Sequence, residues 1–315
     1  MKKILITGVN GFIGNSLYKT LLKTGRLCVG TVRSNNLKSS NFNIEYIPID
    51  NIGLTTNWKI ALKGVDCIIH CAGRAHIMKK IDANEKKIFN SVNVDGTKQL
   101  AKQAAELGVK RLVFLSSIKV NGEVTQEKEI FRYNDTPNPK DAYAKSKLEA
   151  EKVLWKVSSE LGLEIVIVRL PLVYGFDVKG NLARLINLVK SGVFLPLSLV
   201  KNQRSMIGMD NLVDLLIRCI DHPEASGKTF LASDGEDLST PELIKIIASS
   251  IGKKANLFPL SISLLKFLGS IFGRREEINR LVGSLRIDNN YTKEILNWTP
   301  PVSVEEGIRR MVQGK

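Results

Sequence analysis

The sequence predicts an α/β protein in which a doubly wound parallel sheet is joined to a smaller second unit. Short apolar runs alternate with helical patterns over residues 1–170, and this alternation is typical of a parallel sheet with helices on both faces. The runs are apolar throughout, as in strands buried on both faces. Beyond about residue 176 the alternation weakens. We therefore expect a main unit over residues 1–175 and a smaller, interleaved α/β unit over residues 176–315.

The first predicted strand, Lys3–Thr7, leads directly into a glycine-rich loop and then into a helical pattern. Glycines at such a place allow a tight turn and let backbone N–H groups approach a pyrophosphate at the positive end of the helix. A glycine pattern alone is weak evidence, but its place between the first strand and the first helix predicts a dinucleotide-binding loop. The loop residues expected at the cofactor are Gly8, Gly11, Phe12, Ile13 and Gly14.

The second predicted strand, Leu27–Val32, ends next to Arg33 and Ser34. The residue at this place usually meets the adenosine ribose of a dinucleotide. An acidic side chain accepts hydrogen bonds from the ribose hydroxyls of NAD, whereas a guanidinium pairs with the 2′-phosphate of NADP. Arg33 therefore favours NADP(H). NAD(H) stays possible, because a surface arginine at a strand end also explains the residue.

Two further strands and a long helix are predicted to approach the cofactor. The strand Ile44–Ile49 ends where we expect the adenine, and the strand Asp66–Cys71 leads into side chains small enough for close approach of the backbone. A helix is then predicted from about Asn84 to Leu107. The residues expected at the cofactor after the two strands are Asp50, Asn51, Cys71, Ala72 and Gly73.

The fifth predicted strand, Arg111–Leu115, delivers a serine pair ending in Ser117 at its carboxyl end, where ligands bind in open α/β sheets. On the helix that follows, Tyr143 and Lys147 are four residues apart and project from one face. A free phenol titrates near ~10, and a neighbouring ammonium lowers its pKa towards the range of a general base. We expect Ser117, Tyr143 and Lys147 to be catalytic, although the Tyr–Lys spacing alone also fits a solvated helix face.

The remaining elements are less regular. A strand is predicted at Glu164–Arg169, a turn at Leu170–Gly175 and a second-unit strand at Lys228–Ala232. The most apolar segment, Leu257–Gly273, contains a proline and a lysine and is shorter than the ~20 residues of a membrane span. We expect it to be a helix of the smaller unit and not an integral membrane segment; a membrane-surface anchor is the alternative.

Composition narrows the classes of function. The formal net charge is +15, but the basic residues are spread along the chain, which favours an anionic small ligand over a nucleic acid. The four cysteines sit singly in apolar runs, as buried thiols of a reducing compartment do. Glycines interrupt the apolar N-terminal run, so we expect a mature cytoplasmic protein. The three histidines form no pattern with carboxylates that predicts a metal site.

Several motifs occur together along almost the whole chain: Gly8, Gly11, Gly14, Asp50, Asn93, Gly96, Thr97, Ser117, Tyr143, Lys147, the turn Arg169–Gly175 and the late run Leu296–Pro300. With these motifs the chain resembles the extended short-chain dehydrogenase/reductases, in particular their nucleotide-sugar epimerase/dehydratase group. The resemblance implies a Rossmann-type sheet with a C-terminal substrate domain, an NAD(P)-dependent hydride transfer on a UDP-sugar, and a homodimer.

The resemblance also implies a role for each matching residue. Ser117 would hydrogen-bond the reacting oxygen of the sugar, Tyr143 would move its proton, and Lys147 would lower the tyrosine pKa and hold the nicotinamide ribose. Further implied cofactor contacts are Asn93 and Pro171. The implied substrate contacts are Arg74, Ser117, Asn181, Leu182, Arg204 and Arg280, with Arg286 a weaker phosphate candidate. The planar fork of an arginine suits a diphosphate; a surface charge is the alternative explanation for Arg204.

Two departures from the family pattern narrow the reaction. Dehydratases and decarboxylases of the group carry acidic residues after the active-site Ser or Thr, where this chain has Ile118 and Lys119. A lysine cannot replace that carboxylate, so we do not expect dehydration. Leu172 stands where typical galactose epimerases carry an asparagine that contacts the substrate phosphates, which weakens a simple UDP-glucose 4-epimerase assignment.

The runs Gly73–His76 and Ser116–Glu123 look most like a subgroup labelled UDP-glucose 4-epimerase, some members of which reduce UDP-4-keto-6-deoxy-N-acetylhexosamines in surface-polysaccharide synthesis. An epimerase retains its NAD, whereas a reductase exchanges a reduced cofactor, commonly NADPH. Together with Arg33, the resemblance favours the 4-keto reductase, with a UDP-glucose or UDP-N-acetylglucosamine 4-epimerase as the alternative. A non-catalytic dinucleotide sensor is a remote third hypothesis, because it has no evident need for an intact Ser–Tyr–Lys set.

Overall fold

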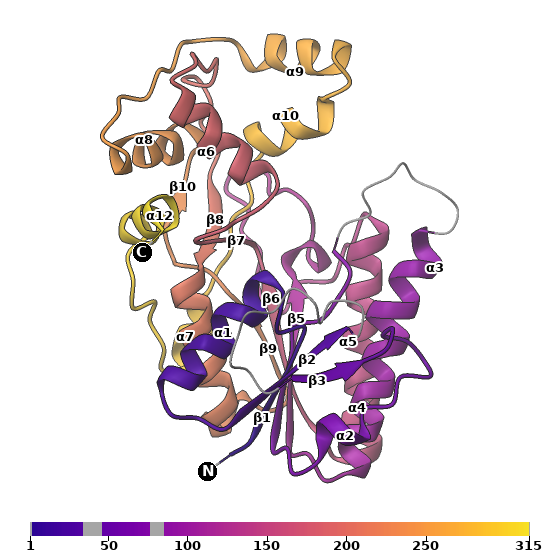
Figure 1. Ribbon diagram of the computed structural model, residues 1–315. Coiled ribbons are helices and arrows are strands. Elements are labelled where there is room, and N and C mark those ends of the chain that lie inside the picture. The colour runs from indigo at the N-terminus through magenta and orange to yellow at the C-terminus, as the bar shows by residue number, and fades with distance from the viewer. Residues whose placement is uncertain (1, 34–45, 76–84, 315) are drawn as a thin grey trace.

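The centre of the protein is a seven-stranded sheet, seen in a computed structural model that describes residues 2–33, 46–75 and 85–314 (Figure 1). Its strands are β1 Ile4–Thr7, β2 Cys28–Arg33, β3 Tyr46–Ile49, β4 Cys67–His70, β5 Arg111–Ser117, β6 Glu164–Leu170 and β9 Lys228–Leu231. They lie in the order β3-β2-β1-β4-β5-β6-β9, and every pairing is parallel. The strand order reverses between β1 and β4, and ligands bind at such a switch point in doubly wound sheets. The predicted Rossmann-type fold is confirmed.

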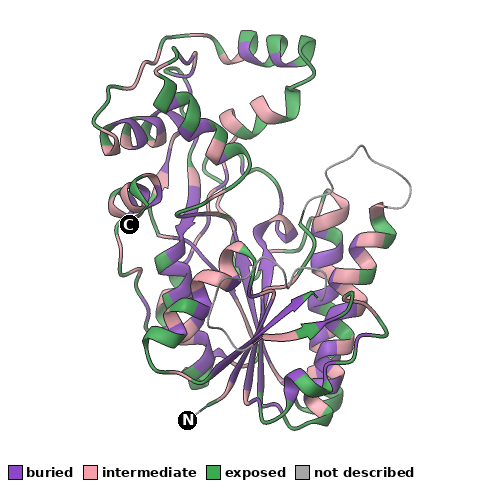
Figure 2. Cartoon of the chain, viewed as in Figure 1, coloured by how far each residue is buried: buried purple, intermediate pink, exposed green. Residues whose placement is uncertain are grey.

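Helices cover both faces of this sheet: α1 Phe12–Lys23, α2 Lys59–Leu62, α4 Gly96–Glu106, α5 Ala142–Leu161 and α7 Met209–Asp221. Successive residues of a strand point to opposite faces. Ile4 and Ile6 therefore pack in the core shared with α1 and α7, whereas Leu5 packs in the core shared with α2, α4 and α5. Figure 2 shows the strands buried between the two helix layers. Both layers hold the carboxyl ends of the strands in place.

The long helix predicted between β4 and β5 is divided in the structure. Its described part consists of α3 Glu85–Phe89, a π-helical segment at Asn90–Asp95, and α4. A Cβ atom on Gly96 would lie 2.2 Å from Ile52 Cγ2, so only glycine allows the backbone of α4 to pack so closely there. The π-helical turn brings Asn93 inward, as such turns do at functional sites. Ser34, Ile44, His76 and Asn84, named above, lie outside the described residues.

The second unit contains a three-stranded sheet, β7 Leu172–Tyr174, β8 Arg204–Gly208 and β10 Asp237–Leu238. Its helices are α6 Asn181–Ser191, α8 Thr240–Ser250, α9 Ile262–Ile271, α10 Arg275–Val282 and α12 Val304–Gln313, whereas α11 Asn290–Leu296 packs in the core of the main sheet. The predicted turn Leu170–Gly175 thus contains a strand, because Leu172–Tyr174 pairs in parallel with β8. The buried Tyr174 also donates a hydrogen bond to Asp234 Oδ2 at 2.7 Å, which holds this segment in place.

The two units interleave. The strand predicted at Lys228–Ala232 is β9, and it pairs with β6 at the edge of the main sheet although β7, α6 and β8 of the second unit precede it in sequence. The division at residue 175 stays a prediction. The segment Leu257–Gly273 contains α9, and in the described parts of the chain no helix has both the length and the apolar composition to cross a membrane.

Candidate active site

Tyr143 lies in the first turn of α5, at the carboxyl end of the main sheet. Asp141 caps this helix, since its Oδ1 accepts a hydrogen bond from Ala144 N at 2.7 Å. The ring of Tyr143 packs against Phe89 of α3, with 5.9 Å between the ring centroids. Gly162, in the left-handed conformation, ends the helix. The tyrosine therefore sits on a long helix whose start is fixed by a side chain.

Ser117 is the last residue of β5, and its side chain hydrogen-bonds Tyr143. Its Oγ also accepts a hydrogen bond from the backbone N–H of Lys119 at 3.3 Å. The register of the sheet sets Ser117 opposite Leu170 of β6. The structure thus brings together the serine and the tyrosine that are predicted to be catalytic, at the edge where ligands bind in such sheets.

Burial raises the pKa of Tyr143 to about 12; the hydrogen bond with Ser117 lowers it and the charge of Asp141 raises it. We expected the ammonium of Lys147 to lower this pKa. In the structure, Lys147 Nζ instead donates to the backbone oxygen of Leu115 at 2.8 Å and lies 4.5 Å from the centroid of the Phe114 ring. The pKa of the phenol is therefore moved in the opposite direction to our expectation.

Lys147 is itself buried, and burial lowers its pKa to about 8 although the charge of Glu151 raises it. Its surroundings include the exit of β4. A Cβ atom on Gly73 would lie 3.4 Å from Lys147 Nζ and 3.3 Å from Asn93 Oδ1. A larger residue at Gly73 would press on both side chains, so glycine at this exit keeps the space around the ammonium open.

The loop after β1 has the geometry expected of a phosphate-binding turn. Gly8 has a φ of +69°, and its carbonyl oxygen accepts a hydrogen bond from Gly11 N at 2.9 Å. A Cβ atom on Gly14 would lie only 2.4 Å from that same oxygen. Phe12 and Ile13 open α1, whose first N–H groups have no partner within the helix. This glycine cradle fits the pyrophosphate of a dinucleotide.

Asn93 holds the chain that leaves β4. Its Oδ1 accepts a hydrogen bond from Arg74 N at 2.8 Å, and its Nδ2 donates to Arg74 O at 3.0 Å. The same Nδ2 donates to Ser146 Oγ of α5 at 3.0 Å. At the start of this exit, Ala72 N donates to Thr7 Oγ1 of β1 at 3.1 Å. The predicted stretch Cys71–Arg74 therefore runs along the carboxyl edge between the glycine cradle and Lys147.

The other predicted cofactor residues lie at strand ends along the same edge. Arg33 is exposed at the end of β2 and is opposite Ile49 in the register with β3. Asp50 and Asn51 follow directly and are exposed. Pro171 follows β6 and is partly buried. These positions fit the adenosine and nicotinamide ends of a dinucleotide that crosses the carboxyl ends of the strands.

Of the predicted substrate residues, Arg204 and Arg280 are far apart in sequence and are brought into contact. Arg204 Nη1 donates to the backbone oxygens of Arg280 and Gly283, at 3.0 and 3.1 Å. Burial, and then the charge of Arg280, lower the pKa of Arg204. The guanidinium of Arg280 also lies 3.5 Å from Glu276 Oε2. Arg204 and Arg280 thus remain candidates for a phosphate group, which the planar fork of an arginine suits.

The remaining substrate candidates are placed differently. Asn181 is exposed at the start of α6, whereas Leu182 is buried in the core of the second unit and offers only its backbone N–H to a ligand. The Nε of Arg286 donates to Asp237 Oδ2 at 3.0 Å, so this guanidinium is already paired. Arg74 is exposed beyond the Asn93 clamp. The proposed substrate contacts of all these residues stay predictions: Asn181, Leu182, Arg286, Arg74, Arg204 and Arg280.

A buried ion pair beneath Ser117 was not found from the sequence. Arg169 Nη2 lies 2.7 Å from Glu151 Oε2, and its Nη1 donates to Asn121 Oδ1 at 3.0 Å. Ser116 Oγ donates to the other oxygen of Glu151. This network ties β5, α5, β6 and the loop after β5 into one unit. No sequence pattern pairs residues 151 and 169, because they come from a helix and from the strand that follows it.

A second network that the sequence did not reveal lies behind the glycine cradle. His70 is buried at the end of β4, with Nδ1 2.7 Å from Thr7 Oγ1 and Nε2 3.0 Å from Thr97 Oγ1. Burial lowers the pKa of His70 to about 3, so the ring is neutral. Its ring stacks on Phe114, the same ring that lies under the ammonium of Lys147. The histidine thus connects β1, β4 and α4 without carrying a charge.

The protein has a Rossmann-type sheet with a glycine cradle after its first strand. A Ser–Tyr pair and a buried lysine lie at the carboxyl edge of this sheet. These features together define an NAD-dependent enzyme of the short-chain dehydrogenase/reductase type. The chain belongs to the NAD dependent epimerase/dehydratase family, whose model matches residues 4–232. It is also 41% identical over 314 residues to a UDP-glucose 4-epimerase of Vibrio cholerae, covering 99% of this chain and 95% of that protein.

Solved structures show the same fold. A UDP-N-acetylglucosamine 4-epimerase from Bacillus cereus superposes with a TM-score of 0.79 and 21% identity, covering 99% of both chains. A UDP-glucuronic acid 4-epimerase from Bacillus cereus, in complex with NAD, superposes with a TM-score of 0.77 and 21% identity, covering 99% of this chain and 97% of that one. The full length of the chain therefore follows one known architecture.

Proposed function

We propose that the protein is a 4-epimerase of a UDP-linked hexose or N-acetylhexosamine and that it retains NAD. The observation that carries the proposal is the hydrogen bond between Ser117 and Tyr143 at the carboxyl edge of a sheet that also holds the glycine cradle. The relative from Vibrio cholerae, at 41% identity, supports the choice of a 4-epimerase over the reductase that we favoured from the sequence.

The cofactor would be held by the glycine cradle, by the stretch Cys71–Gly73, and by Lys147. When bound, NAD supplies the acceptor and donor of the hydride. The protein's own task is to bind and align the two reactants and to keep water away from the reacting carbon. Asn93 fixes the backbone of Arg74 from both sides, which keeps the β4 exit from shifting against α5.

Proton transfer at the sugar oxygen is assigned to Tyr143. With a pKa of about 12 in the protein alone, its phenol is protonated and ready to donate to a carbonyl oxygen at C4. To remove a proton from the C4 hydroxyl instead, Tyr143 needs a lower pKa. The hydrogen bond with Ser117 already lowers the pKa of Tyr143. Ser117 would hold the same sugar oxygen, because its side chain reaches the phenol.

The UDP portion would lie against the second unit. Arg204 and Arg280 supply two cationic side chains on this unit, and the planar fork of an arginine suits a diphosphate. Asn181 and the first turn of α6 would complete this contact, together with Arg74 nearer the reacting end. Lys119 stays engaged with Asp141, which supports the expectation that no dehydration occurs here.

The test is to incubate the purified protein, without added cofactor, with UDP-glucose and separately with UDP-N-acetylglucosamine. An epimerase interconverts each accepted sugar with its C4 epimer and keeps stoichiometric NAD through dialysis. Turnover that requires added NADPH and consumes it would contradict the proposal. A variant with Tyr143→Phe serves as the control for a contaminating epimerase, since it keeps the fold and removes the hydroxyl.

The 4-keto reductase using NADPH remains a second candidate, because Arg33 is exposed at the end of β2, where a 2′-phosphate would lie. Calorimetric binding of the four cofactor forms to stripped protein, repeated with Arg33→Asp, separates the two. Preference for NADPH that Arg33→Asp abolishes supports the reductase; tight binding of NAD that is indifferent to Arg33 supports the epimerase. The homodimer stays a prediction, to be checked by sedimentation.

A further inference from the structure

The helix α9 turns its apolar face to solvent. Leu264, Phe267, Leu268, Ile271 and Phe272 follow the spacing i, i+3, i+4, i+7, i+8 that places side chains in one stripe. Their exposed fractions are 43%, 61%, 36%, 61% and 72%. In a surface helix such a stripe normally packs against the core. Here the residues that α9 buries are Leu265 and Gly269, at one edge of the stripe.

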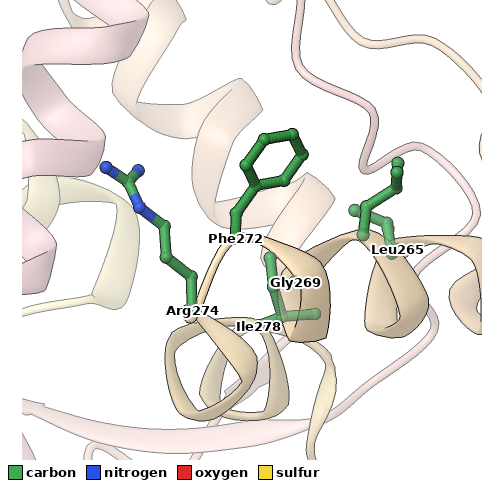
Figure 3. A pocket seen from close by; sticks show the side chains of 6 residues that line it. Leu265, Gly269, Phe272, Arg274 and Ile278 are labelled. Atoms are coloured by element: carbon green, nitrogen blue, oxygen red, sulfur yellow. The ribbon is translucent and has the colours of Figure 1, made fainter.

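The neighbouring helix α10 does not cover this stripe. The two helices pack through Gly269, where a Cβ atom would lie 2.7 Å from Ile278 Cγ1. Helix α10 has no buried residue of its own. Phe272 and Arg274 project to the same side from the connection between the helices, and both line a pocket there (Figure 3). The connection therefore presents an aromatic ring beside a cation.

The charge around the stripe has one sign. Residues 243–275 contain six basic side chains and no acidic one. Lys266, Arg274 and Arg275 are exposed and form no ion pair with any residue that the structure describes. The next two carboxylates along the chain are already engaged, Glu276 with Arg280 and Glu277 with Arg184. An apolar stripe flanked by uncompensated cations results, and we call α9 with its connection to α10, residues 262–275, the basic-apolar face.

We propose that the basic-apolar face docks the protein on an anionic lipid bilayer. An amphipathic helix with Phe and Leu on one side and Lys and Arg beside them lies in the plane of a bilayer, with its apolar face at the headgroup boundary. Basic side chains next to it are attracted by the negative surface potential of anionic lipids. The helices α9 and α10 lie at the end of the second unit remote from the N-terminus of the chain (Figure 1), so they can reach a flat surface.

A second copy of this chain is a less suitable occupant. A symmetric contact through the basic-apolar face would bring the same surface of each copy together, with its uncompensated Lys266, Arg274 and Arg275. Like charges brought together at an interface oppose association. A net charge of +15 adds to that repulsion at longer range. An anionic bilayer satisfies both the apolar stripe and the cations.

The test is flotation of the full chain with vesicles of phosphatidylcholine, with and without phosphatidylglycerol. We expect binding to the mixed vesicles that high salt weakens. The double variant Phe267→Ser, Phe272→Ser should bind at least tenfold more weakly, and so should Arg274→Ser, Arg275→Ser. The matched control is Leu54→Ser, Ile60→Ser, which removes two apolar side chains that are 60% and 75% exposed on the main unit; its binding should equal that of the parent.

Equal flotation of the parent and of the double Phe variant would overturn the proposal, as would binding to pure phosphatidylcholine that is insensitive to salt. Sedimentation of the same proteins tests self-association. If the parent is a dimer, the double Phe variant is a monomer and neither floats with vesicles, the basic-apolar face is a self-association surface and lipid docking is overturned. Epimerase activity on soluble substrate should be unchanged in all these variants, which separates this test from that of the proposed function.

Discussion

The ammonium of Lys119 lies 2.5 Å from Asp141 Oδ2, across the space between the loop after β5 and the start of α5. The same carboxylate caps the helix through Ala144 N, and its charge raises the pKa of Tyr143. Lys119 therefore neutralises a charge that opposes phenolate formation two residues away. The ion pair is partly exposed, and it fixes Ser117 and Tyr143 relative to one another from the outside.

Replacing Lys119 with Met should reduce turnover without unfolding the protein. Loss of the cation leaves Asp141 uncompensated, so the pKa of Tyr143 rises further and the pH–rate profile shifts to higher pH. We expect roughly a five- to tenfold fall in kcat at neutral pH, the effect of about one pKa unit. The control is Lys145→Met, at an exposed position of α5, the helix that carries Tyr143. A profile that does not move would leave Lys119 without a role in the reaction.

Tyr143→Phe should lose turnover by about 10²–10⁴-fold, the usual contribution of a general acid or base. Binding of NAD should change little, since the ring and its packing against Phe89 are kept. The matched control is Tyr133→Phe, because Tyr133 stacks on Tyr291 at 3.6 Å and its ring is preserved in the same way. Single-turnover measurements with titrated cofactor check both expectations. Full activity in Tyr143→Phe would remove the phenol from the mechanism.

Arg169→Met should destabilise the protein by about 3–5 kcal/mol, because it leaves the Glu151 carboxylate buried and unpaired. The double variant Glu151→Leu, Arg169→Met should recover much of this loss, since neither charge then remains. The exposed pair Arg184–Glu277 is the comparison, and Arg184→Met should cost less than about 1 kcal/mol. Urea denaturation gives the free energies. A double variant no more stable than Arg169→Met alone would contradict this account.

Lys147→Met should make the protein more stable near neutral pH and inactive. Burial lowers the pKa of Lys147 from 10.5 to about 8. When the ammonium is charged in both the folded and the unfolded protein, this shift lowers the free energy of unfolding by about 3 kcal/mol. That cost is fully present below about pH 8 and fades as pH rises towards the unfolded value, because the unfolded chain then binds more protons than the folded one.

The gain in stability of Lys147→Met over the parent should therefore be largest at neutral pH and small near pH 10. Its size at neutral pH is reduced by the lost hydrogen bond to Leu115 O, by about 1 kcal/mol. Chemical denaturation at several pH values measures it, with Lys145→Met as the exposed control. A variant less stable than the parent at neutral pH would show that the buried ammonium stabilises the fold.

The sequence predicted the parts of the site that depend on local chain order. Gly8 was expected at a tight turn after a strand, and Ser117 at a strand end, because the run of apolar residues before each one marks where the strand stops. Gly14 was expected with Gly8 from the glycine spacing that opens the first helix. Tyr143 and Lys147 were expected to project from one face of a helix, since their spacing is that of one helical turn. The parallel, doubly wound sheet followed from the alternation of apolar runs with helical patterns.

What the sequence did not reveal depends on how elements pack. The spacing of Tyr143 and Lys147 says nothing about the carbonyl of Leu115, which lies on β5 and takes the ammonium. The pairing of Glu151 with Arg169 requires α5 to lie against β6. The strand Leu172–Tyr174 was expected as a turn, because three residues before a glycine are too few to show periodicity; its partner β8 comes thirty residues later.

The place of β9 at the edge of the main sheet bears on how the chain is synthesised. Until the ribosome has released residue 231, the outer side of β6 has no neighbour, and its row of unpaired backbone groups is open to pairing with other nascent chains. A fragment cut at residue 175 keeps that open edge permanently. Premature termination between residue 175 and Lys228, where β9 begins, should therefore yield insoluble product, even though Ser117, Tyr143 and Lys147 are all present.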